Sequence, residues 1–199
     1  MSAWLRECVL LFIGLLILSY VLGSLSSAIL VCRFLSLPDP RLSGSHNAGS
    51  SNVLRTSGTK AAMLTFLGDV SKGIVAIGIG QWMELPMHQL VWLSCAAVVG
   101  HIWPIFFEFK GGKGVATALG AMIVLSYPFS ISLMLIWLIV YFIFHYASVA
   151  SLFSAISAPI LSYAFFPELF SITLVLMMLT LCKHRSNLQR LKQGKESKL

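Results

Sequence analysis

The chain contains apolar segments long enough to cross a lipid bilayer, and only short polar stretches separate them. The segment 114–145 has no Asp, Glu, Lys or Arg, and about 20 apolar residues suffice to span the hydrocarbon core as a helix. Charged residues make up 11% of the 199 residues, against about a quarter in soluble domains. So few polar side chains cannot coat a globule in water. We therefore expect an all-α, polytopic integral membrane protein.

Seven membrane-spanning helices are predicted within a single membrane-embedded domain, 1–199, whose basic tail begins near residue 184. Pro128 and Pro167 divide blocks too long for one helix, since proline lacks a backbone donor and disfavours helix in the preceding residue. Pro104 is expected to kink the third span. The first apolar run is too long for a signal-peptide core. The predicted spans are 8–31, 61–83, 89–107, 114–127, 129–145, 148–166 and 169–183; five spans, with both broken blocks merged, are the alternative.

The distribution of Lys and Arg predicts how the protein lies in the membrane. If residues 32–60 face the cytoplasm and the sides alternate, twelve of the fourteen Lys and Arg residues lie inside. The positive-inside rule then places the N-terminus outside and the C-terminus in the cytoplasm. The net charge of +7 is accordingly assigned to membrane edges rather than to a nucleic-acid partner.

Three polar stretches, 43–55, 110–114 and 184–190, are predicted to share the cytoplasmic side. The first is rich in small donors and ends in an arginine, whose planar guanidinium suits a phosphate. Ser50-Ser51 stands where a Walker site needs Lys-Ser/Thr, which excludes that site. A plain polar turn is the alternative. The candidate substrate-binding residues here are Ser45, Asn47, Gly49, Asn52 and Arg55.

The second stretch leads directly into a predicted helix. A helix N-terminus presents unpaired amides and a partial positive charge, so glycines before it let an anion approach closely. Gly111, Gly112, Lys113 and Gly114 are therefore candidate phosphate-binding residues. Lysines at a membrane edge also act as simple topological anchors, which is the alternative.

Further candidates lie near the predicted cytoplasmic ends of later helices. His184 and Asn187 share one helix face, although a basic tail can simply bind anionic headgroups. Ser148 and Ser151 lie one turn apart, although serines in a span often bond their own helix. Their predicted roles are in substrate binding or catalysis.

Inside the spans, Asp69 and Lys72 are expected to pair, since intramembrane charges are costly, and His101 is interpreted as a structural hydrogen-bonding residue. No metal site or cofactor is expected. The cysteines lack CxxC spacing and are interpreted as small buried hydrophobic residues: Cys8, Cys32, Cys95 and Cys182.

Together these motifs resemble the acyl-phosphate:glycerol-3-phosphate acyltransferases of bacteria, the PlsY family. The resemblance extends from Gly23 to Arg190. This chain departs from it at His46, where the family typically has glycine, and at Ser50-Ser51, where Ala-Thr is more usual. The resemblance is carried by Gly44–Arg55, Gly100-His101 with Pro104, Asp69, Lys72-Gly73, Phe109–Thr117, Ser148, Ser151 and His184–Asn187.

The resemblance implies a seven-helix enzyme of the bacterial plasma (inner) membrane with a cytoplasmic active site. It would transfer an acyl chain from acyl phosphate to glycerol 3-phosphate, giving 1-acylglycerol 3-phosphate (lysophosphatidate) and phosphate in phospholipid biosynthesis. A soluble enzyme that makes acyl phosphate would be the pathway partner, and membrane lipid the surroundings. The residues that the resemblance implies in catalysis are Ser45, Arg55, Lys113, Ser151, His184 and Asn187.

Acyl phosphate is already activated, so we expect direct attack by the glycerol hydroxyl without an acyl-enzyme. Either the donor's own phosphate or His184 would accept the proton. A transporter for a small phosphorylated metabolite is the alternative from another class. It is less favoured because transporters tend to place their sites near the midplane between repeated halves, and no repeat is visible here.

Overall fold

The protein is described by a computed structural model over residues 3–198, and this part of the chain is helical, with no β-strand. The ends of the predicted domain, 1–2 and 199, lie outside the described residues. In chain order the elements are α1 Ala3–Gly23, α2 Ser27–Phe34, α3 Ser50–Ser57, α4 Thr59–Trp82, α5 Met87–Ile102, the 3₁₀ turn η1 Ile105–Phe107, α6 Val115–Leu125, α7 Tyr127–Phe144, α8 Ala147–Phe165, the 3₁₀ turn η2 Pro167–Leu169, α9 Phe170–Lys183 and α10 Arg185–Lys192.

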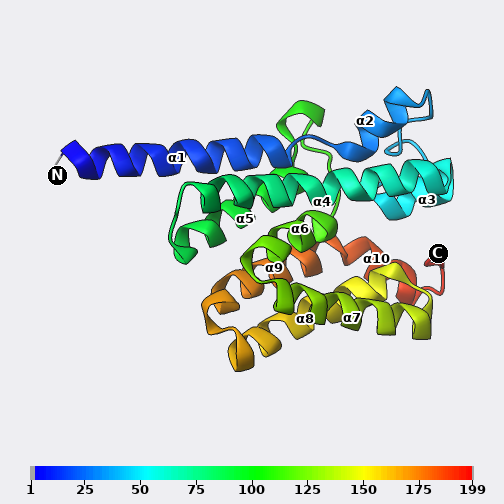
Figure 1. The fold of residues 1–199 in the computed structure, drawn as a ribbon. Helices are drawn as coiled ribbons and strands as arrows, with labels where there is room; N and C mark the ends of the chain where they lie inside the picture. Colours follow the sequence, from blue (N-terminus) through cyan, green and yellow to red (C-terminus); the bar gives the residue numbers. More distant parts are fainter. Residues whose placement is uncertain (1–2, 199) are drawn as a thin grey trace.

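The long helices form a bundle with two distinct ends (Figure 1). Helices α1, α4 and α5 form one group and α7, α8 and α9 the other, and α6 joins them by packing on α4, α5 and α7. The N-terminus and the α4–α5 and α8–α9 turns lie at one end. Helices α2, α3 and α10 and the C-terminus lie at the opposite end, which we call the polar end.

Two helix crossings depend on pairs of glycines. A Cβ atom on Gly73 of α4 would lie 2.3 Å from the Thr117 carbonyl oxygen of α6, and one on Gly120 would lie 2.0 Å from the Val70 oxygen. Gly23 of α1 and Gly100 of α5 meet the facing backbones in the same way. Small residues let membrane helices approach this closely, so these glycines allow the close crossings of α4 with α6 and of α1 with α5.

Five of the seven predicted spans correspond to helices with the length and hydropathy of a membrane crossing. A sixth is obtained if α9 and α10, which meet at 52°, are counted as one bent span. Helix α6 has only 11 residues, or about 16 Å at 1.5 Å per residue, roughly half of the hydrocarbon thickness. The seven-span count therefore stays a prediction.

The first predicted span was too long. Helix α1 ends at Gly23, and a turn separates it from α2, which begins at Ser27. The Ser24 hydroxyl donates to the Tyr20 carbonyl at 2.8 Å, and Lys72 of α4 donates to the Leu25 carbonyl at 3.0 Å. Side chains thus bond carbonyls at this break, and apolarity alone did not reveal the turn.

The breaks predicted from proline are confirmed. Ser126 is extended between α6 and α7, with Pro128 in the first turn of α7, and Pro167 begins η2 after α8. At Pro104 the predicted kink is a full helix end, because α5 stops at Ile102. Proline's missing N–H and its steric restriction on the preceding residue account for these boundaries.

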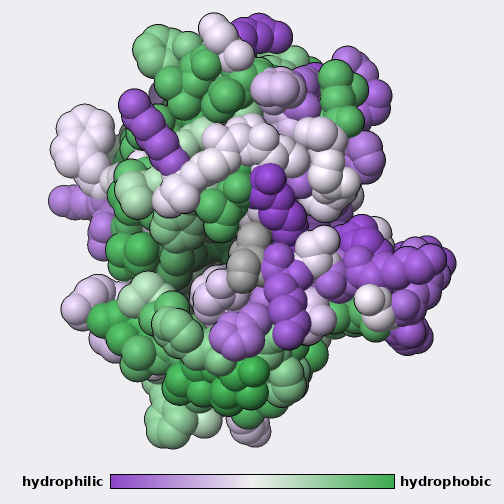
Figure 2. Space-filling view, turned by 90° about the vertical axis from the view of Figure 1, so that its right-hand side faces the viewer, coloured by the Kyte–Doolittle hydropathy of each residue, from purple (hydrophilic) through white to green (hydrophobic). Residues whose placement is uncertain are grey.

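The outer surface is apolar, as expected where lipid is the solvent. Leu10 on α1 is 67% exposed and Ile160 on α8 is 66% exposed. Figure 2 views the polar end, where hydrophilic residues gather across the middle between two hydrophobic regions. The prediction of buried cysteines is wrong for Cys8 and Cys182, which are exposed. A thiol tolerates the apolar surface of such a bundle as well as its interior.

Candidate active site

The three polar stretches meet at one cavity of about 580 Å³ near the polar end. All six residues predicted to be catalytic line it. Its other walls are mostly apolar and come from α4, α6, α7, α8 and α9, including Met63, Phe66, Leu133, Trp137, Ala155, Ala158, Leu176 and Met177. The predicted site residues in its lining are Ser45, Asn47, Gly49, Asn52, Arg55, Asp69, His101, Lys113, Gly114, Ser148, Ser151, His184 and Asn187.

Asn52 organises the first polar stretch from within. Its amide nitrogen donates to the Pro40 and Ser43 carbonyls at 2.7 and 3.1 Å, and its oxygen accepts from the Ser45 N–H at 2.8 Å. Both amide hydrogens are therefore bonded to backbone carbonyls of the loop. Asn52 has no N–H left for the phosphate contact that the sequence predicts for it. In the structure its side chain holds the backbone at Ser45.

The departure at His46 has a conformational explanation. His46 has φ +56°, a left-handed conformation that glycine adopts without the steric cost of a Cβ. Its ring Nδ1 lies 3.1 Å from the Arg41 carbonyl oxygen. Since a carbonyl can only accept, Nδ1 carries the hydrogen of this bond, which holds the histidine in a backbone conformation that favours glycine.

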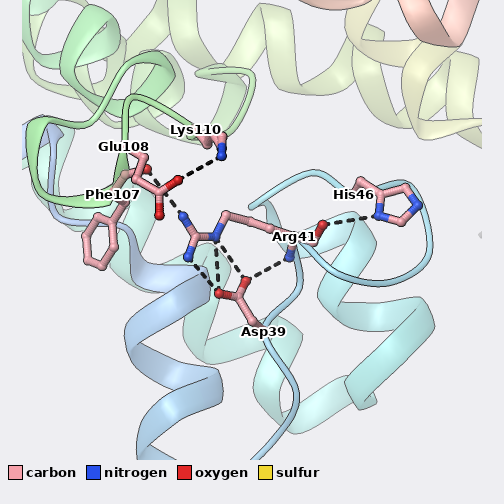
Figure 3. Close-up of polar contacts among 6 residues, drawn as sticks. All are labelled: Asp39, Arg41, His46, Phe107, Glu108 and Lys110. Atoms are coloured by element: carbon pink, nitrogen blue, oxygen red, sulfur yellow. Dashed lines mark hydrogen bonds and ion pairs between the residues drawn. The ribbon is translucent and has the colours of Figure 1, made fainter.

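Arg41 connects the first polar stretch to the turn before the second. Its guanidinium pairs with Asp39 at 2.8 Å and donates to the Phe107 carbonyl at 3.3 Å, as Figure 3 shows. Hydrogen bonds from Arg41 lower the pKa of Asp39, so the pair stays ionised. Lys110 is bound instead to Glu108 at 2.7 Å, and both are exposed. Arg41 was not singled out from the sequence, because its partner at Phe107 is 66 residues away.

Lys113 is the cation that the second stretch delivers to the cavity. Its ammonium donates to the Asn187 side-chain oxygen. Burial, together with the charges of Arg190 and Arg55, lowers the pKa of Lys113 to about 8, although Glu196 opposes the shift. Gly111 and Gly112 instead pack on the end of α5. A Cβ on either would lie within 2.2 Å of His101 atoms, and neither glycine lines the cavity.

His184 and Asn187 are both buried at the α9–α10 junction, at 2% and 4% exposure. The His184 Nδ1 lies 2.9 Å from the Thr180 carbonyl oxygen. This contact requires hydrogen on Nδ1, so Nε2 of the neutral ring has the lone pair that can accept a proton. The predicted pair therefore lies together on the cavity wall.

Glu196 is a site residue that sequence reasoning missed. Its carboxylate accepts hydrogen bonds from Ser148 at 2.8 Å, Asn187 at 2.5 Å and Arg190 at 2.7 Å. Burial disfavours its ionised form, but these three donors outweigh burial and lower its pKa. No sequence signal marks it, since it lies in the basic tail beyond all three polar stretches.

The two serines of α8 differ in their partners. The Ser151 hydroxyl donates to the Ala147 carbonyl at 2.8 Å, which is the alternative raised from the sequence, and accepts from the Trp137 indole at 3.1 Å. Ser148 bonds Glu196 rather than its own helix. Ser148 is thus the serine whose hydrogen goes to an anion.

The predicted Asp69–Lys72 pair is confirmed at 3.0 Å, and both residues are buried in α4. His101 of α5 places its Nδ1 3.5 Å from the same carboxylate oxygen. This cluster joins α4, α5 and the glycines of the second stretch, and thereby supports the loop that ends in Lys113. Within residues 3–198, no group of three His, Cys, Asp or Glu side chains is arranged to hold a metal ion.

The fold and the cavity define a class of protein: a helical membrane protein with cationic and polar side chains at one end of a cavity and an apolar cavity wall between its helices. The sequence profile of the glycerol-3-phosphate acyltransferase family matches residues 13–194. The chain belongs to this family.

Relatives of this family resemble the chain over nearly its whole length. A glycerol-3-phosphate acyltransferase of Neisseria meningitidis is 44% identical over 187 residues, which cover 91% of this chain and 94% of that protein. One of Coxiella burnetii is 41% identical over 194 residues, covering 94% and 98%. The crystal structure of PlsY, an integral membrane glycerol 3-phosphate acyltransferase, in its glycerol 3-phosphate form is similar with a TM-score of 0.89, 34% identity, and coverage of 94% and 95%.

Proposed function

We propose that this protein transfers an acyl chain from acyl phosphate to glycerol 3-phosphate, giving 1-acylglycerol 3-phosphate and inorganic phosphate for phospholipid biosynthesis. Family membership supports the acceptor and the transferase class. Similar PlsY crystal structures are described as glycerol 3-phosphate and lysophosphatidic acid forms, with TM-scores of 0.89 and 0.86, and these names correspond to the acceptor and the product proposed here.

The observation that carries the proposal is the two-part character of the cavity. Arg55, Lys113 and Asn187 line one part, and the apolar residues of α6 to α9 line the other. An acyl phosphate has the same two parts, an anionic head and a hydrocarbon chain. A carrier of small phosphorylated metabolites would have no need of the apolar lining, so acyl transfer is favoured over transport.

We assign phosphate binding to Arg55 and Lys113, because both are cationic and line the cavity. Arginine presents a planar fork to phosphate oxygens, and lysine a compact charge. Ser45, Asn47, Gly49 and Gly114 complete this part of the wall. Asn187 holds Lys113 through its side-chain oxygen, and we therefore assign Asn187 to positioning that charge.

In the proposed step the glycerol hydroxyl oxygen attacks the carbonyl carbon of acyl phosphate. The bond from that carbon to the bridging phosphate oxygen breaks, and phosphate leaves with the electron pair. The hydroxyl proton passes to the departing phosphate or to Nε2 of His184, whose tautomer supports the second route. Orientation of the two bound anions contributes to the rate enhancement, as does stabilisation of the developing charge. A trapped acyl-Ser45 or acyl-Ser151 adduct would contradict direct transfer.

We further propose seven membrane crossings in the bacterial plasma membrane, with the polar end in the cytoplasm and the N-terminus outside. Helices α6 and α9 would be the two short crossings. The positive-inside rule supports this orientation. A cytoplasmic site would receive acyl phosphate from the soluble enzyme that makes it.

The test is an acylation assay with the purified protein in lipid. Glycerol 3-phosphate is supplied with palmitoyl phosphate, palmitoyl-CoA or palmitoyl carrier protein, and phosphate and lysophosphatidate are measured. We expect product with palmitoyl phosphate alone. Arg55→Ala and Lys113→Ala should each lower kcat/KM by about 10²–10³-fold, the effect typical of removing one group that stabilises developing charge.

Lys110→Ala is the matched control, because Lys110 lies in the same stretch but is exposed and paired with Glu108. Its activity should stay within about twofold of the unaltered protein. Equal activity with the thioesters would overturn the donor assignment. If folded protein acylates nothing but moves glycerol 3-phosphate into liposomes, transport replaces acyl transfer as the function.

A further inference from the structure

Arg41 joins the two loops that carry the proposed phosphate-binding residues. Its guanidinium donates to both carboxylate oxygens of Asp39 at 2.8–3.1 Å, and it reaches across to the Phe107 carbonyl at 3.3 Å (Figure 3). The His46 ring holds the backbone carbonyl of Arg41 itself at 3.1 Å. The side chain and the backbone of this one residue are therefore both held, with the first polar stretch on one side and the η1 turn on the other.

Each end of this contact leads directly to residues of the cavity. On one side, the Asn52 side chain bonds the carbonyl just before Arg41 at 2.7 Å and the N–H of Ser45 at 2.8 Å. On the other side, Phe107 stands six positions before Lys113 in the chain. Ser45 and Lys113 both line the cavity. The hydrogen bond from Arg41 to Phe107 thus lies between two short connections to the site.

The turn that presents the Phe107 carbonyl has an uncommon backbone conformation. Glu108 and Phe109 have φ +56° and +57°, left-handed values that are rare for residues with a Cβ and most of all for bulky ones. Such backbone persists only where the surrounding structure over-determines it, and it is concentrated at functional sites. The Lys110 N–H donates to the Phe107 carbonyl at 3.0 Å, and Arg41 supplies the second hydrogen bond to this oxygen.

We propose that Arg41 is a positioning residue of the acyl-transfer site, which clasps the η1 turn and thereby keeps Arg55 aligned with Lys113. This inference rests on the proposed function, in which Arg55 and Lys113 bind phosphate. Asn52 connects Arg41 to α3, the helix that carries Arg55. Arg41 itself does not line the cavity, so it acts through the loops. Direct transfer needs the reacting atoms of two bound substrates in line, and a misplacement of about 1 Å can cost about 10²-fold in rate.

The experiment compares Arg41→Gln with the unaltered protein in the acylation assay. Glutamine lacks the charged fork that holds Asp39 and the Phe107 carbonyl together. We expect kcat to fall about 10–100-fold because the bound substrates are misaligned, with the KM for either substrate changed by no more than about threefold.

Arg33→Gln is the matched control. The pKa of Asp39 is lowered chiefly by its hydrogen bonds to Arg41, and the charge of Arg33 also acts on it. The Arg33 side chain is exposed and, within residues 3–198, makes no hydrogen bond to the second polar stretch. This variant therefore loses a charge near the same carboxylate without losing the clasp, and its kcat should stay within about twofold, as is usual for a surface substitution.

Arg41→Lys separates geometry from charge. Lysine keeps the positive charge but lacks the planar fork, so its kcat should stay at least about fivefold below that of the unaltered protein. Asp39→Asn should also lower kcat. Combined with Arg41→Gln it should cost little more, because both changes remove the same contact and their effects are not additive. Asp39→Asn also tests the clasp if Arg41→Gln does not fold.

Two further measurements distinguish positioning from folding and from substrate binding. The melting temperature of Arg41→Gln should fall by no more than about 4 °C, because the pair with Asp39 is partly exposed and such pairs add little stability. Inorganic phosphate should raise the melting temperature of this variant at a concentration within about threefold of that needed for the unaltered protein, because Arg55 and Lys113 remain to bind it.

Three outcomes would overturn the proposal. A lower melting temperature with kcat unchanged would leave Arg41 a purely structural role. Full activity of Arg41→Lys would show that charge alone matters. A rise in KM greater than the fall in kcat would make Arg41 a binding residue. Failure of the proposed function would look different, because acyl transfer would then be absent from the unaltered protein.

Discussion

At the scale of single residues, the site separates groups that hold the loops from groups that are available to a substrate. Asn52 gives both amide hydrogens to backbone carbonyls. Gly112 packs on His101. Lys113 and His184 instead present a charge and a ring nitrogen at the cavity wall. Residues of one motif therefore have different roles. Their contacts show whether each one holds a loop or faces the cavity.

The pKa of Lys113 predicts how substrate affinity depends on pH. Since burial lowers this pKa to about 8, Lys113 is charged well below that pH. It loses its charge as the pH rises through that value. Glycerol 3-phosphate stays a dianion over this range, because its second pKa is near 6. The KM for glycerol 3-phosphate should therefore rise severalfold between pH 7 and 9.5, measured at saturating acyl phosphate.

Lys113→Arg is the control for this pH dependence, because a guanidinium stays charged throughout the range. Its KM at pH 7 is expected to be higher, since a planar fork does not reproduce the contact with Asn187. Its pH profile should nevertheless be flat. The same rise in both proteins would assign the titration to another group.

What the sequence could reveal at this scale depended on distance along the chain. The first polar stretch is contiguous, so its donors and arginine were recognisable directly. The bond from Arg41 to the Phe107 carbonyl and the bond from Ser148 to the Glu196 carboxylate join residues 66 and 48 positions apart. No local pattern encodes such pairs, and only the fold brings them together.

At the scale of helices, the boundaries set by proline were predictable, and those set by tertiary contacts were not. Pro128 and Pro167 act through their own geometry. The break after α1 involves Lys72, which donates to Leu25 from a different helix. Helix α6 begins directly after Gly114, whose φ of +85° is left-handed, within one residue of the start that the sequence predicted.

The α4–α6 crossing gives a prediction about stability. In Gly73→Ala the new methyl group would meet backbone atoms Thr117 O and Ala121 N at 2.3 and 2.8 Å, which cannot move aside cheaply. Overpacking of this kind typically costs about 1–3 kcal/mol. Thermal unfolding in detergent should therefore shift to lower temperature.

Gly78→Ala is the matched control in the same helix, since nothing lies within 4 Å of its added methyl group. Alanine is the better helix former by about 1 kcal/mol, so this variant should be as stable as the unaltered protein or more so. Equal destabilisation of the two variants would show that the crossing does not depend on close approach at Gly73.

At the scale of the whole molecule, both the distribution of charge and the arrangement of the helices distinguish two ends of the bundle. The α4–α5 and α8–α9 turns, with Glu84 and Glu168, lie with the N-terminus, and α3 and α10 lie at the polar end (Figure 1). The basic residues Arg55 and Arg190 belong to these last two helices. The sequence predicted this segregation because loop charge is a local property, whereas the lengths of α6 and α9 depend on how they pack.

The proposed orientation is tested by labelling single cysteines in intact cells with a thiol reagent that cannot cross membranes. In a protein whose four cysteines are replaced by alanine, Glu84→Cys and Glu168→Cys should be labelled from outside. Lys110→Cys and Lys192→Cys should be labelled only after the cells are opened, because their positive charges favour the cytoplasmic side. All four positions lie outside the five helices that are each long enough to span the membrane, so differences in labelling report the side of the membrane. Labelling of the two lysine positions in intact cells would reverse the topology and place the candidate active site away from a cytoplasmic acyl-phosphate supply.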